Sequence, residues 1–150
     1  MLSRVVLGLA LAAWPGAAAT AAEVLPGPVA AEVLAVPDGD TLVVRARIWI
    51  GQAVEVKVRL AGIDAPEMKG RCESERALAR AARDRLARSA AVGGTVTLTD
   101  IRYGKYAGRV LARISDGAGA DLGAALVAAG LARPYSGGRR TPWCPRTAAR

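Results

Sequence analysis

Apolar and polar residues alternate strictly over residues 54–60, which predicts a β-strand with one buried face. A strand over about residues 41–48 has the same period and places Leu42, Val44, Ala46 and Ile48 on one face. Similar runs predict three more strands. The five predicted strands cover residues 31–36, 41–48, 54–60, 95–99 and 110–114. Short turns, Pro37-Asp38-Gly39 and Gly51-Gln52, separate the first three strands, so these are expected to form a meander.

Two segments have the period of an amphipathic helix. The first runs from about Cys72 to Ala90, and its apolar stripe is Leu78, Ala82 and Leu86. The second covers about residues 122–129, with Asp121 as N-cap and Gly130 just after its end. This order of elements is compatible with the OB-fold, which commonly binds oligonucleotides. The predicted fold class is therefore α+β, a five-stranded OB-fold barrel capped by two or three helices.

The first residues have the organisation of an export signal. Arg4 precedes the apolar run Val5 to Trp14, and small residues with an A-x-A cleavage pattern follow. That run is too short to span a bilayer, although an uncleaved anchor is the alternative. The expected layout is a signal peptide at 1–22, a linker at 23–30, one domain at 31–135 and an irregular tail at 136–150. We expect a periplasmic or secreted protein without stable membrane association after cleavage.

Export changes the interpretation of the two cysteines. In an oxidising compartment an even number of cysteines favours a disulfide, here between Cys72 and Cys144. This bond would tie the tail to the start of the first helix. Two cysteines in a chain without histidine make a poor zinc site.

The chain is strongly basic, with 21 Lys and Arg against 13 Asp and Glu and a formal net charge of +8. A small domain with this excess usually has a surface that faces a polyanion, because neutralising phosphates releases condensed counterions. General solubility is the alternative, and charge alone does not identify a partner.

Acidic residues gather after two of the predicted strands. Asp38 and Asp40 lie in the first turn, and Asp64-Ala65-Pro66-Glu67 follows the third strand. Carboxylates from two adjacent turns can converge at one end of a barrel. With a backbone carbonyl and water they suit Ca²⁺, and Pro66 restricts the backbone of Ala65 and so fixes the direction of its carbonyl. Ordinary turn chemistry is the alternative.

Two arginines are candidates for binding a phosphate. The alternation puts Arg59 on the face away from Val58, so the core does not need its side chain. A guanidinium beside a divalent cation suits a phosphate on which negative charge develops. Arg109 at the start of the fifth strand is the second candidate, with Arg113 as the alternative. Either one is otherwise a solvated strand residue.

Taken together, these segments resemble the staphylococcal nuclease (thermonuclease) family. The resemblance covers about residues 31–135 and rests on Asp38 to Thr41, Arg59 to Glu67, Lys105 to Arg109 and Leu122 to Ala132. It implies a calcium-dependent nuclease on an OB-fold, which cuts DNA and RNA with little sequence preference and leaves 3′-phosphates.

The resemblance also implies roles for single residues. The calcium ligands would be Asp40, Asp64 and the carbonyl of Ala65, the catalytic residues Arg59, Glu67 and Arg109, and the substrate contacts Lys105, Tyr106 and Tyr135. Glu67 would orient or deprotonate the attacking water. The two arginines would stabilise the transition state, and Tyr135 would stack on a base. The chain departs from the family in one extra residue before Arg109 and in a short segment after Glu67.

Two other functions are compatible with parts of the pattern. A non-catalytic OB-fold module would hold nucleic acid or another polyanion without cutting it, but it would not need carboxylates beside a phosphate site. A structural envelope protein would leave the polar residues unexplained. The sequence therefore favours an exported nuclease that acts as a monomer on nucleic acid.

Overall fold

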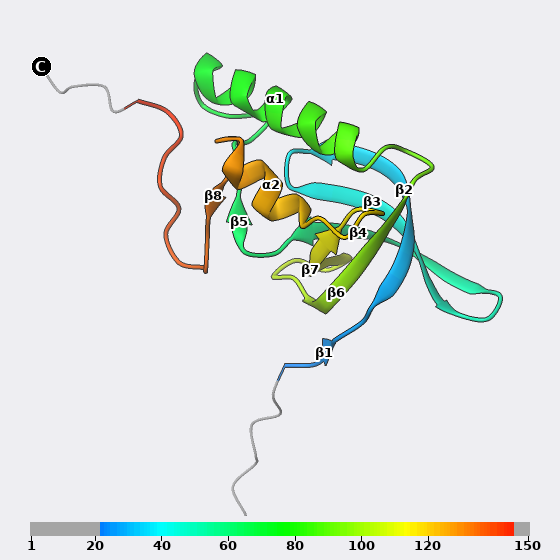
Figure 1. Cartoon of the computed structure of the whole chain (residues 1–150). Coiled ribbons are helices and arrows are strands. Elements are labelled where there is room, and N and C mark those ends of the chain that lie inside the picture. Colours follow the sequence, from blue (N-terminus) through cyan, green and yellow to red (C-terminus); the bar gives the residue numbers. More distant parts are fainter. Residues whose placement is uncertain (1–21, 146–150) are drawn as a thin grey trace, which may run out of the picture.

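Five strands close into a mixed β-barrel in the computed structural model, which describes residues 22–145 (Figure 1). The strands are β2 (Val29–Asp38), β3 (Thr41–Trp49), β4 (Gln52–Leu60), β6 (Thr95–Tyr103) and β7 (Arg109–Ser115). Neighbours pair antiparallel except β4 and β7, which are parallel, and the β6–β7 pairing closes the barrel. The predicted OB-fold and the meander are confirmed.

In the part of the chain that the structure describes, two helices accompany the barrel. Helix α1 (Glu73–Ser89) lies across one end, and the shorter α2 (Leu122–Ala128) lies beside it (Figure 1). The side chain of Asp121 caps α2 by accepting a hydrogen bond of 2.8 Å from the backbone N–H of Ala124. Within residues 22–145, neither helix is long and apolar enough to span a membrane.

The face of α1 that packs on the barrel differs slightly from the prediction. Its buried residues are Glu75, Ala79, Ala82 and Leu86, whereas Leu78 is only partly buried. These positions follow the three- and four-residue spacing of a single helix stripe. The stripe therefore begins with a carboxylate, which periodicity of apolar residues alone does not reveal.

The hairpin formed by β3 and β4 extends beyond the rest of the barrel (Figure 1). Ile48 was predicted on the buried face, but it is 49% exposed, and Trp49 at the tip is 71% exposed. Strand β2 pairs with β3 only as far as Ala46, so the last residues of β3 have no neighbouring strand on that side. The prediction for Ile48 was wrong because the β3–β4 hairpin extends beyond the hydrophobic core at this residue, although the alternating pattern continues.

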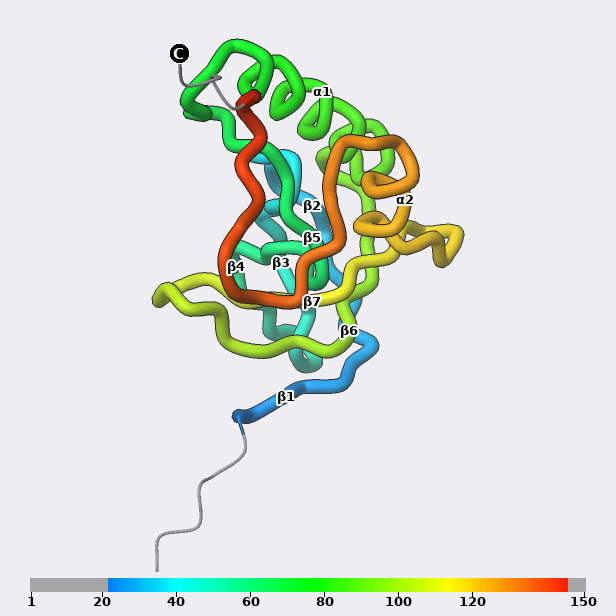
Figure 2. Tube along the Cα trace, turned by 90° about the vertical axis from the view of Figure 1, so that its left-hand side faces the viewer, coloured from blue at the N-terminus to red at the C-terminus, as the bar shows by residue number. Residues whose placement is uncertain are grey.

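The segments on either side of the barrel hold short strands that periodicity did not predict. In the stretch predicted as a linker, β1 (Val24–Leu25) pairs with β6, and β2 begins at Val29. Near the other end, β8 (Arg133–Pro134) pairs antiparallel with β5 (Ile63–Asp64). From β8 the chain runs past the barrel to the start of α1 (Figure 2). Almost all of the predicted signal peptide and residues 146–150 of the tail lie outside the described residues.

Candidate functional site

Three charged residues from neighbouring segments meet at one end of the barrel. Asp40 precedes β3, Arg59 lies in β4 opposite Thr41, and Asp64 lies in β5. The backbone N–H of Leu60 donates to the carbonyl of Asp40 at 2.8 Å, which holds the turn against β4. Sheet register therefore places these side chains together, as the short turns predicted.

The three side chains form a buried charged group. Arg59 donates from Nη1 to Oδ2 of Asp40, and its Nη2 lies 3.8 Å from Oδ1 of Asp64. The hydroxyl of Thr41 donates to Oδ1 of Asp40 at 2.9 Å. Asp40, Arg59 and Asp64 are 6%, 9% and 4% exposed. Burying two carboxylates with one arginine leaves negative charge without full compensation.

The electrostatics of Asp40 reflect this imbalance. Burial is the largest influence and raises the pKa of its carboxyl above the ordinary value, although Arg59 and the hydrogen bond from Thr41 oppose it. The negative charges of Glu67 and Asp38 add to the rise. A cation at this place would favour the ionised carboxylate.

Three buried side-chain atoms in residues 22–145 have no hydrogen-bond partner, and all belong to predicted site residues. They are Nη2 of Arg59, Oδ1 of Asp64 and Nε of Arg109. Buried polar atoms are nearly always paired, so a cluster of exceptions calls for an explanation. Two are donors that suit a phosphate, and one is an acceptor that suits a cation.

A cavity of about 550 Å³, separate from the hollow of about 200 Å³ that Asp64 lines, opens beside Asp40, Arg59 and Arg109. Its lining includes eight predicted or neighbouring site residues: Asp38, Asp40, Arg59, Glu67, Lys105, Tyr106, Arg109 and Tyr135. A hollow of about 620 Å³ beside it reaches Tyr106 and Arg109 but none of the aspartates. We place the functional site in the cavity of about 550 Å³, because it brings Asp40 and Glu67 together with both Arg59 and Arg109.

The two candidate arginines of β7 lie in different places. Arg109 lines the cavity, with its guanidinium carbon 5.1 Å from the centre of the Tyr106 ring. Arg113 is exposed and pairs with Asp100 at 3.4 Å and with Asp121 at 3.8 Å, outside the cavity. The structure thus brings Arg109, and not Arg113, to Arg59.

Residues 57–143 match the family model described as staphylococcal nuclease homologue, which is more than half of the chain. The chain belongs to the staphylococcal nuclease family. The match includes Arg59, Asp64, Glu67 and Arg109, and this family is typically metal-dependent. Membership places the chain among nuclease-type domains. A comparison with curated proteins found no match.

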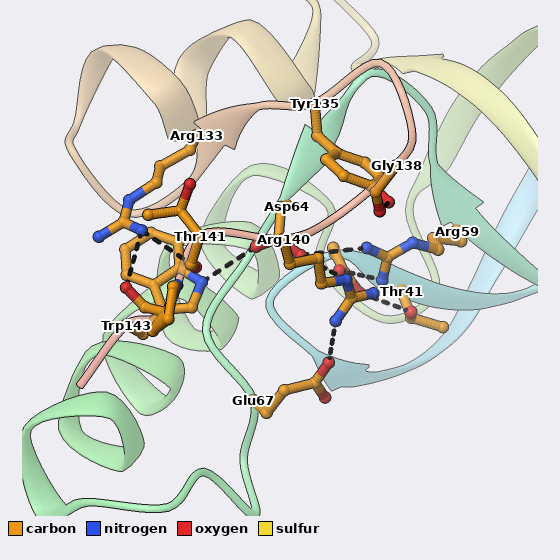
Figure 3. Close-up of polar contacts among 12 residues, drawn as sticks. Thr41, Arg59, Asp64, Glu67, Arg133, Tyr135, Gly138, Arg140, Thr141 and Trp143 are labelled. Carbon is orange, nitrogen blue, oxygen red and sulfur yellow. Dashed lines mark hydrogen bonds and ion pairs between the residues drawn. The ribbon is translucent and has the colours of Figure 1, made fainter.

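In this member of the staphylococcal nuclease family, the tail reaches the site (Figure 3). Nη1 of Arg140 lies 2.6 Å from Oε1 of Glu67, and its Nε lies 3.1 Å from Oδ1 of Asp64. The second contact is an ion pair without hydrogen-bond geometry, so Oδ1 still lacks a donor. The indole N–H of Trp143 donates to Oδ2 of Asp64 at 3.1 Å.

Sequence reasoning missed Arg140 and Trp143. The signal was the predicted disulfide, which ties the tail to a segment close to Glu67 and so brings the residues before Cys144 toward the site. The pKa of Arg140 is raised: burial acts to lower it, but the hydrogen bond to Glu67 and the charge of Asp64 outweigh burial.

The predicted substrate contacts lie on the rim of the cavity. Tyr106 is 61% exposed, and Nζ of Lys105 lies 5.9 Å from the centre of its ring. The hydroxyl of Tyr135 donates to the carbonyl of Gly138 at 2.7 Å, which turns its ring along the tail. Ala65, whose carbonyl was predicted as a calcium ligand and not as a substrate contact, is 3% exposed and follows Asp64 directly.

A disulfide joins Cys72 and Cys144, with 5.9 Å between their Cα atoms. The carboxylate of Glu75 lies beside it and accepts hydrogen bonds from the backbone N–H groups of Arg71 at 3.1 Å and Glu67 at 3.4 Å. The two sulfurs and Glu75 are close enough to hold an ion, but sulfurs bonded to each other are not thiolate ligands. Glu75 therefore anchors the segment that carries Glu67.

Proposed function

We propose that the protein is an exported, calcium-dependent nuclease that hydrolyses phosphodiester bonds of DNA and RNA with little sequence preference. The observation that supports this best is the set of buried atoms without hydrogen-bond partners: Nη2 of Arg59 and Nε of Arg109, whose side chains line one cavity, and Oδ1 of Asp64, 3.8 Å from that Nη2. A phosphate and a cation together would satisfy all three. A purely structural charge cluster would be expected to pair them internally.

The residues present fit a hard divalent cation. Asp40 and Asp64 are buried carboxylates whose oxygens are the ligands that Ca²⁺ prefers, and the proposed third ligand is the carbonyl of Ala65, which directly follows Asp64. When bound, the cation supplies charge that polarises the phosphate. Oδ1 of Asp64 has no hydrogen-bond donor, and burial raises the pKa of Asp40, so a bound cation would stabilise both carboxylates in their ionised form.

The two arginines stabilise the phosphate as negative charge grows on its oxygens. Arg59 lines the cavity and is held by Asp40, and its Nη2, 3.8 Å from Oδ1 of Asp64, still lacks a hydrogen-bond partner. Arg109 approaches from β7 with its own unpaired Nε. Preorganised donors of this kind contribute roughly 10²- to 10³-fold in rate each.

Glu67 acts as the general base. Its side chain is 56% exposed and lines the cavity, so water reaches it from solvent. The water oxygen attacks phosphorus while its proton passes to the Glu67 carboxylate. The bond from phosphorus to the 5′-oxygen breaks, and that oxygen takes a proton from solvent. The products are a 3′-phosphate and a 5′-hydroxyl.

Substrate binding uses the cavity rim. Lys105 provides a charge for a terminal phosphate, while the exposed ring of Tyr106 and the ring of Tyr135 offer stacking surfaces for bases. Stacking is tolerant of sequence because every base has a flat face. These contacts support weak sequence preference and binding that declines as salt rises.

Export rests on residues 1–22, with their basic start, apolar run and small-residue end. We infer a periplasmic or secreted monomer whose disulfide forms in that oxidising compartment.

The test is cleavage of heat-denatured DNA by the purified protein with calcium, with excess EGTA, and with calcium after Glu67→Gln. Glu55→Gln is a matched control, because Glu55 is exposed in the β3–β4 hairpin. We expect calcium-dependent fragments ending in 3′-phosphate from the wild type and the control, and a loss of at least about 10²-fold in the Glu67 variant. DNA that is shifted in mobility but intact under every condition would support the binding module instead.

A further inference from the structure

The tail residues 136–145, called here the C-terminal strap, cross the candidate site. They follow β8, which pairs with the strand that contains Asp64, and they end next to the start of α1 (Figure 2). No predicted role in catalysis uses this segment. Its contacts with the site nevertheless involve two of the residues that the proposed function requires, Asp64 and Glu67.

Several anchors fix the position of the strap. Cys144 is bonded to Cys72 at its end, and Tyr135 donates to the carbonyl of Gly138 near its beginning. Between them, Nη1 of Arg133 donates to the carbonyls of Thr141 at 3.3 Å and Pro142 at 3.2 Å. The Arg133 guanidinium also stacks 3.7 Å from the centre of the Trp143 ring. The strap is therefore held on both sides of Arg140.

This arrangement puts a positive charge between two carboxylates. Arg140 contacts Glu67 at 2.6 Å and Asp64 at 3.1 Å (Figure 3). The side chain of Asp64 is only 5% exposed, so a charge near it is poorly screened by water. The guanidinium of Arg140 therefore balances part of the negative charge of these two carboxylates, as a bound cation would.

Arg140 and a cation would compete for the same acceptor. Oδ1 of Asp64 is the oxygen that Arg140 approaches, while Oδ2 is held by Trp143. A cation bound to Oδ1 would lie next to the guanidinium, and like charges at such short distance repel strongly in a buried place. Binding of one therefore disfavours the other, and by linkage the effect is reciprocal.

We propose that Arg140 is an internal cation of this site, which occupies its acidic side until a divalent cation displaces it, and that the Cys72–Cys144 disulfide holds it there. This inference rests on the proposed cation site at Asp40 and Asp64. It adds a way to regulate the site, because the position of the strap sets the apparent affinity of the site for the cation. The disulfide contributes by keeping Arg140 at high effective concentration, four residues from its anchor.

The experiment is titration of calcium into the purified protein by calorimetry, so that the readout is binding and not cleavage. The variants are Arg140→Gln, Arg139→Gln, and Cys72→Ser with Cys144→Ser. Arg139→Gln is the matched control, because it removes the same charge from the adjacent exposed residue. An unfolding curve for each variant confirms that it is folded before titration.

We expect Arg140→Gln to bind calcium about tenfold more tightly than Arg139→Gln, within the usual range of coupling between two sites. The double cysteine variant should shift the affinity in the same direction. Adding Arg140→Gln to it should then change the affinity by less than in the disulfide-bonded protein, since the two changes act through one contact.

Equal or weaker calcium binding by Arg140→Gln, in a wild type that does bind calcium, would overturn this inference and leave the proposed nuclease intact. Absence of calcium binding in every folded variant would overturn both. If Arg139→Gln tightened binding as much as Arg140→Gln, general charge would explain the effect, and the inference would again fail.

Discussion

The barrel end and the C-terminal strap contact the same aspartate in different ways. At the barrel end, the side chain of Arg59 is 11% exposed and is placed by the register of β3 and β4. In the strap, the side chain of Arg140 is 43% exposed. Its position depends on contacts with neighbouring side chains and on the Cys72–Cys144 disulfide. Rigid elements position functional groups more accurately than attached segments. We infer that the barrel positions Arg59 for chemistry and that the strap adjusts the affinity of the site for a cation.

The two regions should also differ in energy. Removing one partner from a buried charged pair leaves an uncompensated charge, which costs about 3–5 kcal/mol. Exposed ion pairs contribute about 0–1 kcal/mol. Variants at the barrel end should thus affect both activity and folding, while variants of single strap contacts should affect folding little.

The largest effect is expected for Arg59→Ala. It removes a donor to the phosphate, for a loss of roughly 10²- to 10³-fold in kcat/KM. It also leaves Asp40 buried without its arginine, which lowers the free energy of unfolding by about 3–5 kcal/mol. Cleavage kinetics and urea unfolding measure the two effects. Arg45→Ala, which breaks only exposed pairs with Glu32 and Glu55, is the control and should cost at most about 1 kcal/mol.

An Arg59 variant with normal cleavage would contradict the assignment of chemistry to the barrel end. A stable but inactive variant would keep that assignment and show that Asp40 takes up a proton when its partner is lost.

The second effect concerns the tether of the strap. Replacing both cysteines by serine removes a crosslink between residues 72 positions apart. The chain-entropy account gives a loss of about 4 kcal/mol in the free energy of unfolding. We expect the β-sheet signal in circular dichroism to persist at low denaturant, because the barrel core does not include the strap. Loss of the folded barrel would mean that the strap is part of the core structure.

A smaller effect is expected for Trp143→Phe. Phenylalanine keeps a ring for Arg133 to stack on but removes the hydrogen bond to Asp64. Hydrogen bonds to charged groups are worth about 1.5–3 kcal/mol, and partial exposure puts this one near the lower end. Urea unfolding of the calcium-free protein measures the loss. A loss in the free energy of unfolding as large as that of Arg59→Ala would contradict the expected energetic difference between the strap and the barrel end.

The smallest effect is a pH dependence at Asp40. Because folding raises its pKa, the ionised carboxylate destabilises the calcium-free fold above the folded pKa, and this penalty disappears as the pH falls toward the ordinary value of 3.8. Asp40→Asn carries no such charge. The stability of the variant relative to wild type should therefore be greater at pH 7 than at pH 4. The opposite trend would show that Arg59 dominates over burial.

The barrel could be predicted because its signals are local. Alternation over residues 54–60 and the short turns fix the strands, and these turns bring Asp40 and Asp64 to one end. Arg109 follows from its position at the start of β7. The family resemblance joined these residues into one predicted site, and the residues matched by the family model include Asp64 and Arg109 but not Asp40.

Other features depend on contacts between distant segments, which periodicity does not encode. Glu75 occupies an apolar stripe because the loop before α1 needs an acceptor for its backbone N–H groups. Ile48 is exposed because β3 extends beyond its pairing with β2, which reaches only as far as Ala46. Arg140 lies 73 residues from Glu67, and only the disulfide hinted at their proximity. The features that the sequence did not predict are therefore those that depend on the strap, on loop packing and on where strand pairing ends.

Whether a cation held at the barrel end drives cleavage can be measured with one calcium titration that has two readouts. Binding heat and the rate of DNA cleavage would be followed in parallel for wild type and Asp64→Asn. We expect binding and cleavage to half-saturate at the same calcium concentration in the wild type, and we expect Asp64→Asn to lose both. Cleavage that proceeds at full rate without calcium, or calcium binding that leaves DNA intact, would contradict it.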